Sequence, residues 1–82
     1  MKDVMIINLV NGSQMVFTNS KRDYNYQYDS TTIYLDAEDT RFRIPYTSIL
    51  YIEFKDYDDV KLYEYKENGI PIYNLKKGAA HI

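Results

Sequence analysis

The residues best suited to chemistry in this sequence are tyrosines, of which there are ten in 82 residues. Tyr24, Tyr26 and Tyr28 alternate with polar residues, so in an extended segment their rings share one face. One hypothesis is a platform for single-stranded nucleic acid, because aromatic rings stack on bases of any sequence. Another makes the tyrosines anchors for a protein partner, and a third makes them ordinary strand residues over the core. The nucleic-acid hypothesis uses Lys21, Arg22, Tyr26, Tyr34, Arg41 and Arg43.

Carboxylates gather in two predicted turns, within residues 36–39 and 56–59. Asp-rich turns are common for conformational reasons alone, so solvated turns are the simplest interpretation. A cation site or an acid–base pair is the alternative. Gathered on one side, the carboxylates would imitate a phosphate backbone and occupy a basic groove on a nucleic-acid enzyme. With the tyrosines, the predicted partner-binding set is Tyr24, Tyr26, Tyr28, Asp56, Asp58 and Asp59.

Catalytic motifs are missing from the sequence. His81 is the only histidine and stands second from the end, and there is no cysteine. The sequence contains no glycine-rich phosphate loop, no His–Glu metal pattern and no Ser–His–Asp set. We therefore expect a protein that is not an enzyme, with no catalytic residue, no metal site and no cofactor.

Charge and hydropathy indicate the class of partner and the compartment. The net charge is −2 and the isoelectric point is near 5.2, so no general basic field attracts nucleic acid. This favours a protein partner over nucleic acid. No signal peptide or membrane span is predicted, which indicates a cytoplasmic protein. The expected role is an inhibitor or adaptor, by analogy with small acidic, tyrosine-rich proteins of phages and mobile elements.

Residues 31–55 contain the clearest structural pattern. Centring a turn on residues 38–39 places Leu35 opposite Phe42, Ile33 opposite Ile44, Tyr34 opposite Arg43 and Asp36 opposite Arg41. One face is then apolar, and a one-residue slip would bury two arginines. Pro45 must end its strand, residues 46–48 form a corner, and residues 50–55 add a third strand to the same sheet. The predicted core is Ile33, Leu35, Phe42, Ile44, Leu50, Ile52 and Phe54.

Residues 4–18 predict another hairpin, with a two-residue turn at Asn11-Gly12. This turn places Ile6 opposite Phe17 and makes both faces of the hairpin largely apolar. Such a pair lies inside a small barrel or at an interface. The second apolar face therefore also predicts a homo-oligomer, unless the carboxy-terminal strands cover it within one chain.

The remaining segments complete an all-β prediction. Residues 60–66 form a strand, Asn68-Gly69 a hairpin turn, and residues 70–75 an edge strand containing Pro71. No amphipathic helix is expected. The predicted fold is a small antiparallel meander of six to seven short strands, curled into a barrel or sandwich. One domain spans residues 1–75, and residues 76–82 form a flexible tail.

The segment Ile6 to Phe17, with its Leu-Val-Asn-Gly turn, and the later segment 42–52 resemble the Sm/Hfq small barrels. The resemblance covers about half of the chain and implies a small β-barrel. The family's basic RNA-contacting motif has no counterpart at residues 45–48, so the resemblance transfers no RNA-binding residue.

Overall fold

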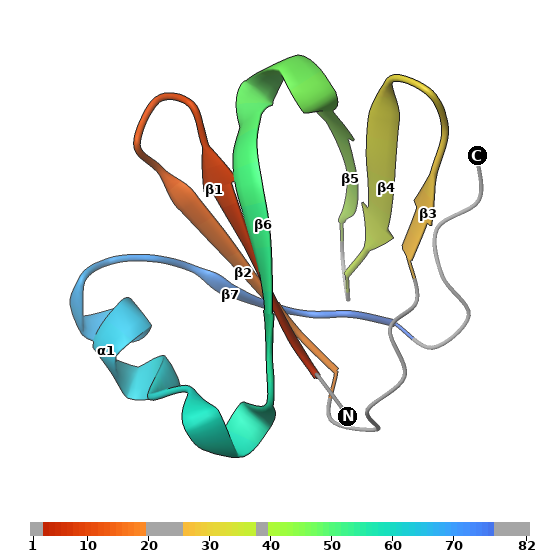
Figure 1. Ribbon diagram of the computed structural model, residues 1–82. Coiled ribbons are helices and arrows are strands. Elements are labelled where there is room, and N and C mark those ends of the chain that lie inside the picture. Colours follow the sequence, from red (N-terminus) through yellow and green to blue (C-terminus); the bar gives the residue numbers. More distant parts are fainter. Residues whose placement is uncertain (1–2, 20–25, 38–39, 77–82) are drawn as a thin grey trace.

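The structure, a computed structural model, describes residues 3–19, 26–37 and 40–76. Within these ranges the chain forms two sheets and one short α-helix (Figure 1). One sheet has the strand order β6–β1–β2–β7, and the other has the order β3–β4–β5. The strands are β1 (Val4–Leu9), β2 (Gln14–Thr18), β3 (Tyr26–Tyr28), β4 (Thr32–Asp36), β5 (Arg41–Pro45), β6 (Ile49–Lys55) and β7 (Ile72–Asn74).

The predicted register of the β4–β5 hairpin is confirmed. All four expected partner pairs are present. On the outer face, the Arg41 guanidinium lies 3.4 Å from the Asp36 carboxylate, and that of Arg43 lies 6.0 Å from the centre of the Tyr34 ring. The inner face is apolar, so the hydrophobic effect and these cross-strand pairs favour the same register.

The predicted register of the β1–β2 hairpin is wrong by one residue. Ile6 pairs with Val16 and not with Phe17, which pairs with Met5 instead. The shift moves Phe17 to the opposite face of the hairpin. There it becomes one of the largest fully buried side chains in the structure.

The loop of this hairpin explains the shift. The Leu9 N–H donates to the Ser13 carbonyl at 2.9 Å, and the Gly12 N–H donates to the Leu9 carbonyl at 3.0 Å. Three residues therefore lie between the paired positions, with Gly12 at a φ of 90°. This is the turn followed by a left-handed residue that closes three-residue hairpins. The predicted two-residue turn was one residue too short.

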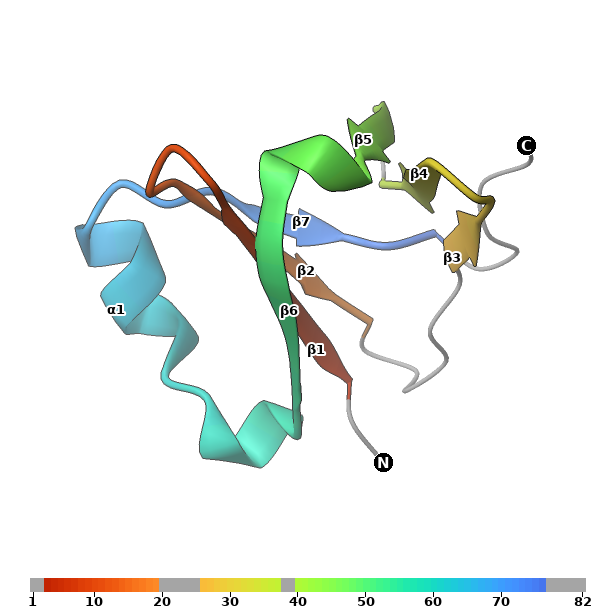
Figure 2. The same ribbon diagram turned by 45° about the horizontal axis from the view of Figure 1, so that its top comes forward.

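The strand after the corner belongs to the other sheet, so its predicted placement is wrong. Pro45 ends β5, and the 3₁₀ turn Tyr46–Ser48 reverses the chain, as the predicted corner requires. β6 then pairs with β1 in antiparallel fashion. Figure 2 shows this corner carrying the chain from β5 to β6, and thus from one sheet to the other.

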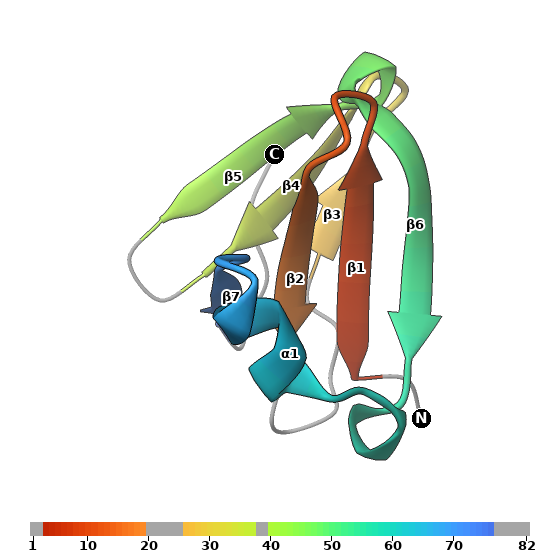
Figure 3. The same cartoon turned by 90° about the vertical axis from the view of Figure 1, so that its left-hand side faces the viewer.

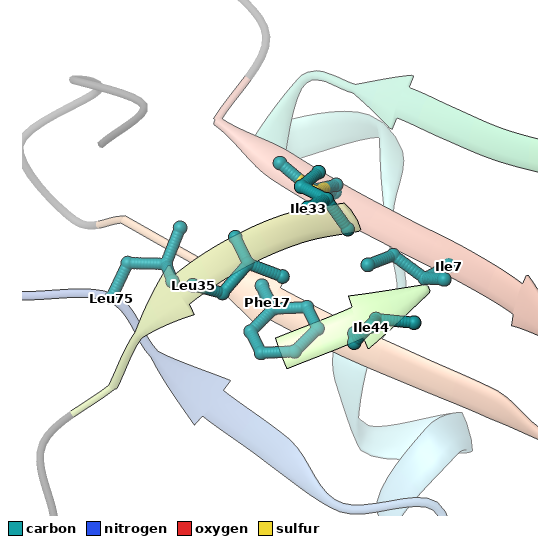
Figure 4. Packing of buried hydrophobic residues seen from close by; sticks show 7 residues of the cluster. Ile7, Phe17, Ile33, Leu35, Ile44 and Leu75 are labelled. Carbon is teal, nitrogen blue, oxygen red and sulfur yellow. The ribbon is translucent and has the colours of Figure 1, made fainter. Parts of the chain in front are cut away.

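The main core lies between the two sheets. It buries residues from both of them (Figure 4), and partly buried side chains, among them Phe42, Ile52 and Tyr26, pack against it. Phe17 lies against two other rings, with centroids 5.4 Å from Phe42 and 5.3 Å from Tyr73. The buried members are Met5, Ile7, Phe17, Ile33, Leu35, Ile44 and Leu75.

Two residues of the predicted core are instead exposed. Leu50 is 65% exposed and Phe54 is 38% exposed. Asn8 pairs with Tyr51 and Leu9 with Ile49, so a bulge leaves Leu50 as an extra residue with no partner position in β1. The bulge breaks the alternation on which the prediction depended. Phe54 lies on an edge strand, where the core covers it incompletely.

The segment predicted as a strand at residues 60–66 is largely helical. α1 spans Leu62–Glu67 and follows a 3₁₀ turn at Tyr57–Asp59. The Ile70 N–H donates to the Tyr65 carbonyl at 2.8 Å, and Gly69 has a φ of 76°. These are features of a Schellman cap, so Asn68-Gly69 ends a helix and does not form a hairpin turn.

β7 is an edge strand, as predicted, but it runs parallel to β2. β6 also runs in the same direction as β7, and α1 lies in the crossover connection between these two strands. The meander prediction is therefore wrong at the carboxy-terminal end.

A second apolar cluster occupies the other face of β1 and β2. α1 lies across this face, on the side away from β3, β4 and β5 (Figure 3). The buried residues Val4, Ile6 and Val16 pack against half-buried side chains, among them Leu62 and Tyr65. The second face of the first hairpin is thus covered within one chain, and it gives no reason for self-association.

The prediction of a mainly β protein is confirmed, with one short helix added among the described residues. The strand pairings there give two sheets and no closed barrel.

An isolated bridge pairs Ala37 with Leu75, and the Lys76 N–H donates to the Asp36 carbonyl at 2.8 Å. The predicted tail is otherwise outside the described residues. No helix in the described ranges is long and apolar enough to cross a membrane.

Candidate protein-interaction surface

Three turns lie in a row along one end of the molecule, at the top of Figure 1 and again side by side in Figure 2. They are the β1–β2 tip, the β3–β4 turn and the β5–β6 corner. The Val10 N–H donates to the Ser48 carbonyl at 3.0 Å, and the Tyr46 N–H donates to the Thr31 carbonyl at 2.9 Å. Each neighbouring pair of turns is thus joined by a backbone hydrogen bond. We call this surface, residues 9–13, 28–32 and 45–50, the loop end.

Asp29 organises the β3–β4 turn. Its carboxylate accepts hydrogen bonds from the backbone N–H groups of Thr31 and Thr32, both at 2.8 Å, and from the Tyr34 hydroxyl at 2.7 Å. The Thr31 backbone bond and then the Tyr34 bond lower the pKa of Asp29 from 3.8 to about 2. The bond to Asp29 also raises the pKa of Tyr34. Asp29 is therefore ionised at neutral pH, and its carboxylate oxygens are engaged within the turn.

Tyr46 connects the corner to the same turn. Its hydroxyl donates to the Asp29 backbone carbonyl at 2.9 Å. Burial raises the pKa of Tyr46, and the negative charge of Asp29 raises it further. These bonds hold the loops in one arrangement. Binding a partner should therefore cost the loops little conformational entropy.

Large apolar side chains are exposed along the loop end. The exposed fractions are 61% for Val10, 66% for Tyr28, 38% for Tyr46 and 65% for Leu50. Val10 is at the β1–β2 tip, Tyr46 and Leu50 are at the corner, and Tyr28 ends β3. Exposed apolar residues mark interaction sites when they lie together, and these four belong to turns that backbone hydrogen bonds join.

The loop end is almost uncharged. Asp29 is the only charged residue in the three ranges, although 27% of the whole chain is charged. The other residues are chiefly Tyr, Ser, Thr, Asn and aliphatic residues. Tyr, Ser, Gly and Asn are the residues that antibody binding loops favour, because they combine large contact area with adaptable hydrogen bonding. The surface offers no cation of its own to a phosphate group.

The alternating tyrosines Tyr24, Tyr26 and Tyr28, which we call the tyrosine stripe, fall partly on this surface. Tyr28 is at the loop end, whereas Tyr26 is half-buried and its ring centroid lies 6.2 Å from that of Phe54. The centroids of Tyr26 and Tyr28 are 6.3 Å apart. Tyr24, Lys21 and Arg22 lie outside the described residues. The two described tyrosines therefore extend from the loop end, at Tyr28, to Phe54 of the edge strand β6, which lies near Tyr26.

The described members of the nucleic-acid set lie on two faces. Tyr34, Arg41 and Arg43 occupy the outer face of the three-stranded sheet. Tyr26 pairs with Leu35, whose side chain is in the core, so it occupies the inner face. Arg41 is also bonded to Asp36. The sheet separates the ring of Tyr26 from the two guanidinium groups.

The acidic members of the partner-binding set lie far from the loop end. β6 begins at the loop end, and Asp56, Asp58 and Asp59 follow its last residue. The turn that contains them is at the bottom of Figure 1, with Asp58 and Asp59 exposed. The predicted tyrosine and aspartate groups therefore do not form one surface at the loop end.

Sequence reasoning missed Val10, Tyr46 and Leu50. Val10 and Leu50 belong to strand-like apolar patterns, and only the three-residue turn and the β6 bulge expose them. One signal was present, because the segments 9–13, 28–32 and 45–50 are turn-rich yet nearly free of charge.

Comparison of the chain with protein-family models, curated proteins and solved structures gives no match. Within the described residues, no group of three or more His, Asp or Glu side chains is arranged to hold a metal ion.

Proposed function

We propose that this protein is a non-catalytic interaction module that binds a protein partner through the loop end. The observation that carries the proposal is the combination of exposed apolar side chains, the absence of charge other than Asp29, and a hydrogen-bonded arrangement of the loops. On this proposal the two facing sheets act as a small sandwich that presents the loops. An inhibitor or adaptor role in the cytoplasm fits such a module.

Tyr28 and Leu50 are the proposed anchors. Tyrosine is enriched among the residues that dominate binding energy. Leu50 is 65% exposed, so a partner that covers it removes a large apolar area from water, which favours binding. Truncating a residue that dominates an interface typically costs about 2 kcal/mol or more in binding. Tyr28→Ala should therefore weaken the complex at least about 30-fold.

Single-strand binding is the alternative function, and it needs cations beside the stacking rings. Its described cations, Arg41 and Arg43, lie on the opposite face of the sheet from Tyr26. Of its two described tyrosines only Tyr34 shares their face, with the Arg43 guanidinium 6.0 Å from its ring centre. Phosphate mimicry by Asp56, Asp58 and Asp59 remains a variant of the protein-partner proposal. It would use the other end of β6.

Photo-crosslinking tests the proposal in cells that make the protein. A photo-reactive phenylalanine derivative replaces Tyr28 in one variant and Tyr63 of α1 in the control, because these residues are similarly exposed, at 66% and 59%. We expect a discrete protein adduct from position 28 that position 63 does not give.

Three outcomes would contradict the proposal. They are no adduct from position 28, the same adducts from both positions, or an adduct that nuclease digestion removes. The last outcome would support the nucleic-acid alternative.

A further inference from the structure

A hollow of about 460 Å³ lies beside α1, away from the loop end. Its lining comes from α1 and the preceding 3₁₀ turn, from β7, from the end of β2 and from Asp3 just before β1. Its volume is within the range of small-molecule sites. The lining residues are Asp3, Thr18, Tyr57, Leu62, Tyr63, Lys66, Ile72 and Asn74.

Lys66 is the cation of this hollow. Two other lysines nearby in the chain are paired, Lys55 with Glu53 at 3.3 Å and Lys61 with Glu64 at 3.9 Å. Lys66 has no carboxylate within ion-pair distance among residues 3–19, 26–37 and 40–76. Its charge is therefore available to a ligand.

Two phenols add neutral donors. Tyr57 and Tyr63 line the hollow and are 46% and 59% exposed, and neither hydroxyl makes a hydrogen bond within the described part of the chain. Asp3 is the one carboxylate among the described lining residues, but it is only 3% exposed and accepts the Tyr57 backbone N–H. The accessible polar groups thus favour an anion.

Two apolar side chains form another part of the lining. Leu62 and Ile72 belong to the second cluster, where they pack against buried residues of β1 and β2. Both are only half-buried, so they present apolar surface next to the donors. A site with an apolar wall and a few convergent polar groups is the usual form of a small-ligand site.

We infer that this hollow binds a small organic anion with an apolar body, the anionic group on Lys66 and the body against Leu62 and Ile72. Carboxylates and phosphate monoesters share this chemistry. The inference is independent of the proposed protein partner, because it uses neither the loop end nor β3.

Titration of the ¹⁵N-labelled protein with four related compounds tests the inference. Phenylacetate and phenyl phosphate are the anions, and benzyl alcohol and phenethylammonium are the neutral and cationic analogues. We expect saturable shifts of amides around the hollow with at least one anion, and weaker or no shifts with the analogues. The better anion distinguishes a carboxylate from a phosphate ligand. Equal responses to the anion and to benzyl alcohol would overturn the inference, as would no response to either anion.

Two lysine variants of α1 provide the matched control. Lys66→Gln should weaken anion binding about tenfold or more, because a hydrogen bond to a charged group is lost. Lys61→Gln should leave the affinity within about twofold, since Lys61 is already paired and lines a different hollow. Lys66 is also in the last turn of α1, where a cation favours the helix, so thermal unfolding of both variants is measured as well. Equal affinities of the two folded variants would overturn the inference.

Discussion

The two ends of the molecule are held together by different forces. At the loop end, hydrogen bonds to Asp29 and between the turns order residues that are exposed and almost uncharged. At the α1 end, a six-residue helix is held mainly by half-buried apolar side chains and is flanked by hollows of about 460 and 400 Å³. Directional bonds position a surface accurately, whereas a lightly packed helix leaves space beside it. The loop end therefore has the properties of a protein-binding surface, and the α1 end has space for a small ligand.

The largest effect is expected from the main core between the two sheets. Phe17 is fully buried and contacts two other rings, so Phe17→Ala should destabilise the protein by about 3–5 kcal/mol through lost burial and a cavity. Phe42→Ala should cost less, because Phe42 is only partly buried. Urea unfolding of the two variants measures the difference. A greater loss for Phe42→Ala would mean that the core is centred on β5 and not on β2.

A smaller and more local effect is expected at α1. Leu62 is half-buried, so Leu62→Ala should cost about 1–2 kcal/mol. Hydrogen exchange should accelerate in residues 60–70 and change little at the loop end, because the second cluster is separate from the main core. Equal acceleration at both ends would show that the two clusters unfold as one unit.

One glycine at each end permits a direct comparison. Gly12 and Gly69 have φ values of 90° and 76°, and a Cβ atom at either position would meet nothing within 4 Å. Only the left-handed conformation should therefore oppose Gly12→Ala or Gly69→Ala, at about 1 kcal/mol each. Thermal unfolding checks that the two losses are similar. A much larger loss at one end would reveal a packing requirement at that glycine.

The pH dependence of the amide chemical shifts should differ between the loop end and the α1 end. The folded pKa of Asp29 is lowered to about 2 from 3.8, so its stabilising effect is present above the unfolded value and is lost as the pH falls toward 2. Loop-end amide shifts should change between about pH 4 and pH 2. Asp29→Asn should lose that transition while the α1 amides behave as in the parent protein. An unaltered loop-end transition in Asp29→Asn would contradict the role given to this carboxylate.

The two hairpins show why part of this fold was predictable. In β4–β5, Arg41 and Arg43 alternate with apolar residues, so only one register buries no charge. In β1–β2 both faces are apolar, and the pattern does not distinguish a register from its neighbour one residue away. The turn alone then sets the register, and the sequence Asn11-Gly12 is compatible with loops of two and of three residues.

The helix α1 was not predicted, because six residues give too short a pattern to distinguish a helix from a strand. Val60, Leu62 and Tyr65 are spaced so that a strand and a single helical turn are both plausible, and the residues between them are polar or aromatic. The sequence predicts a hairpin turn at Asn68-Gly69, whereas Gly69, with a φ of 76°, belongs to a helix cap. The loop end was hidden for another reason, because its three segments are distant in sequence and meet only through the strand pairing.

The salt dependence of the complex tests the central claim most directly. The measurement is the dissociation constant between this protein and the partner crosslinked at position 28, at about 0.05 M and about 0.5 M NaCl, a range over which screening of exposed charges becomes severe. An interface made by the loop end, where Asp29 is the one charged residue, predicts a change of less than about threefold. A loss of about 100-fold or more would contradict this account, since it would place the binding energy on the acidic turn after β6 or on cations facing a phosphate backbone.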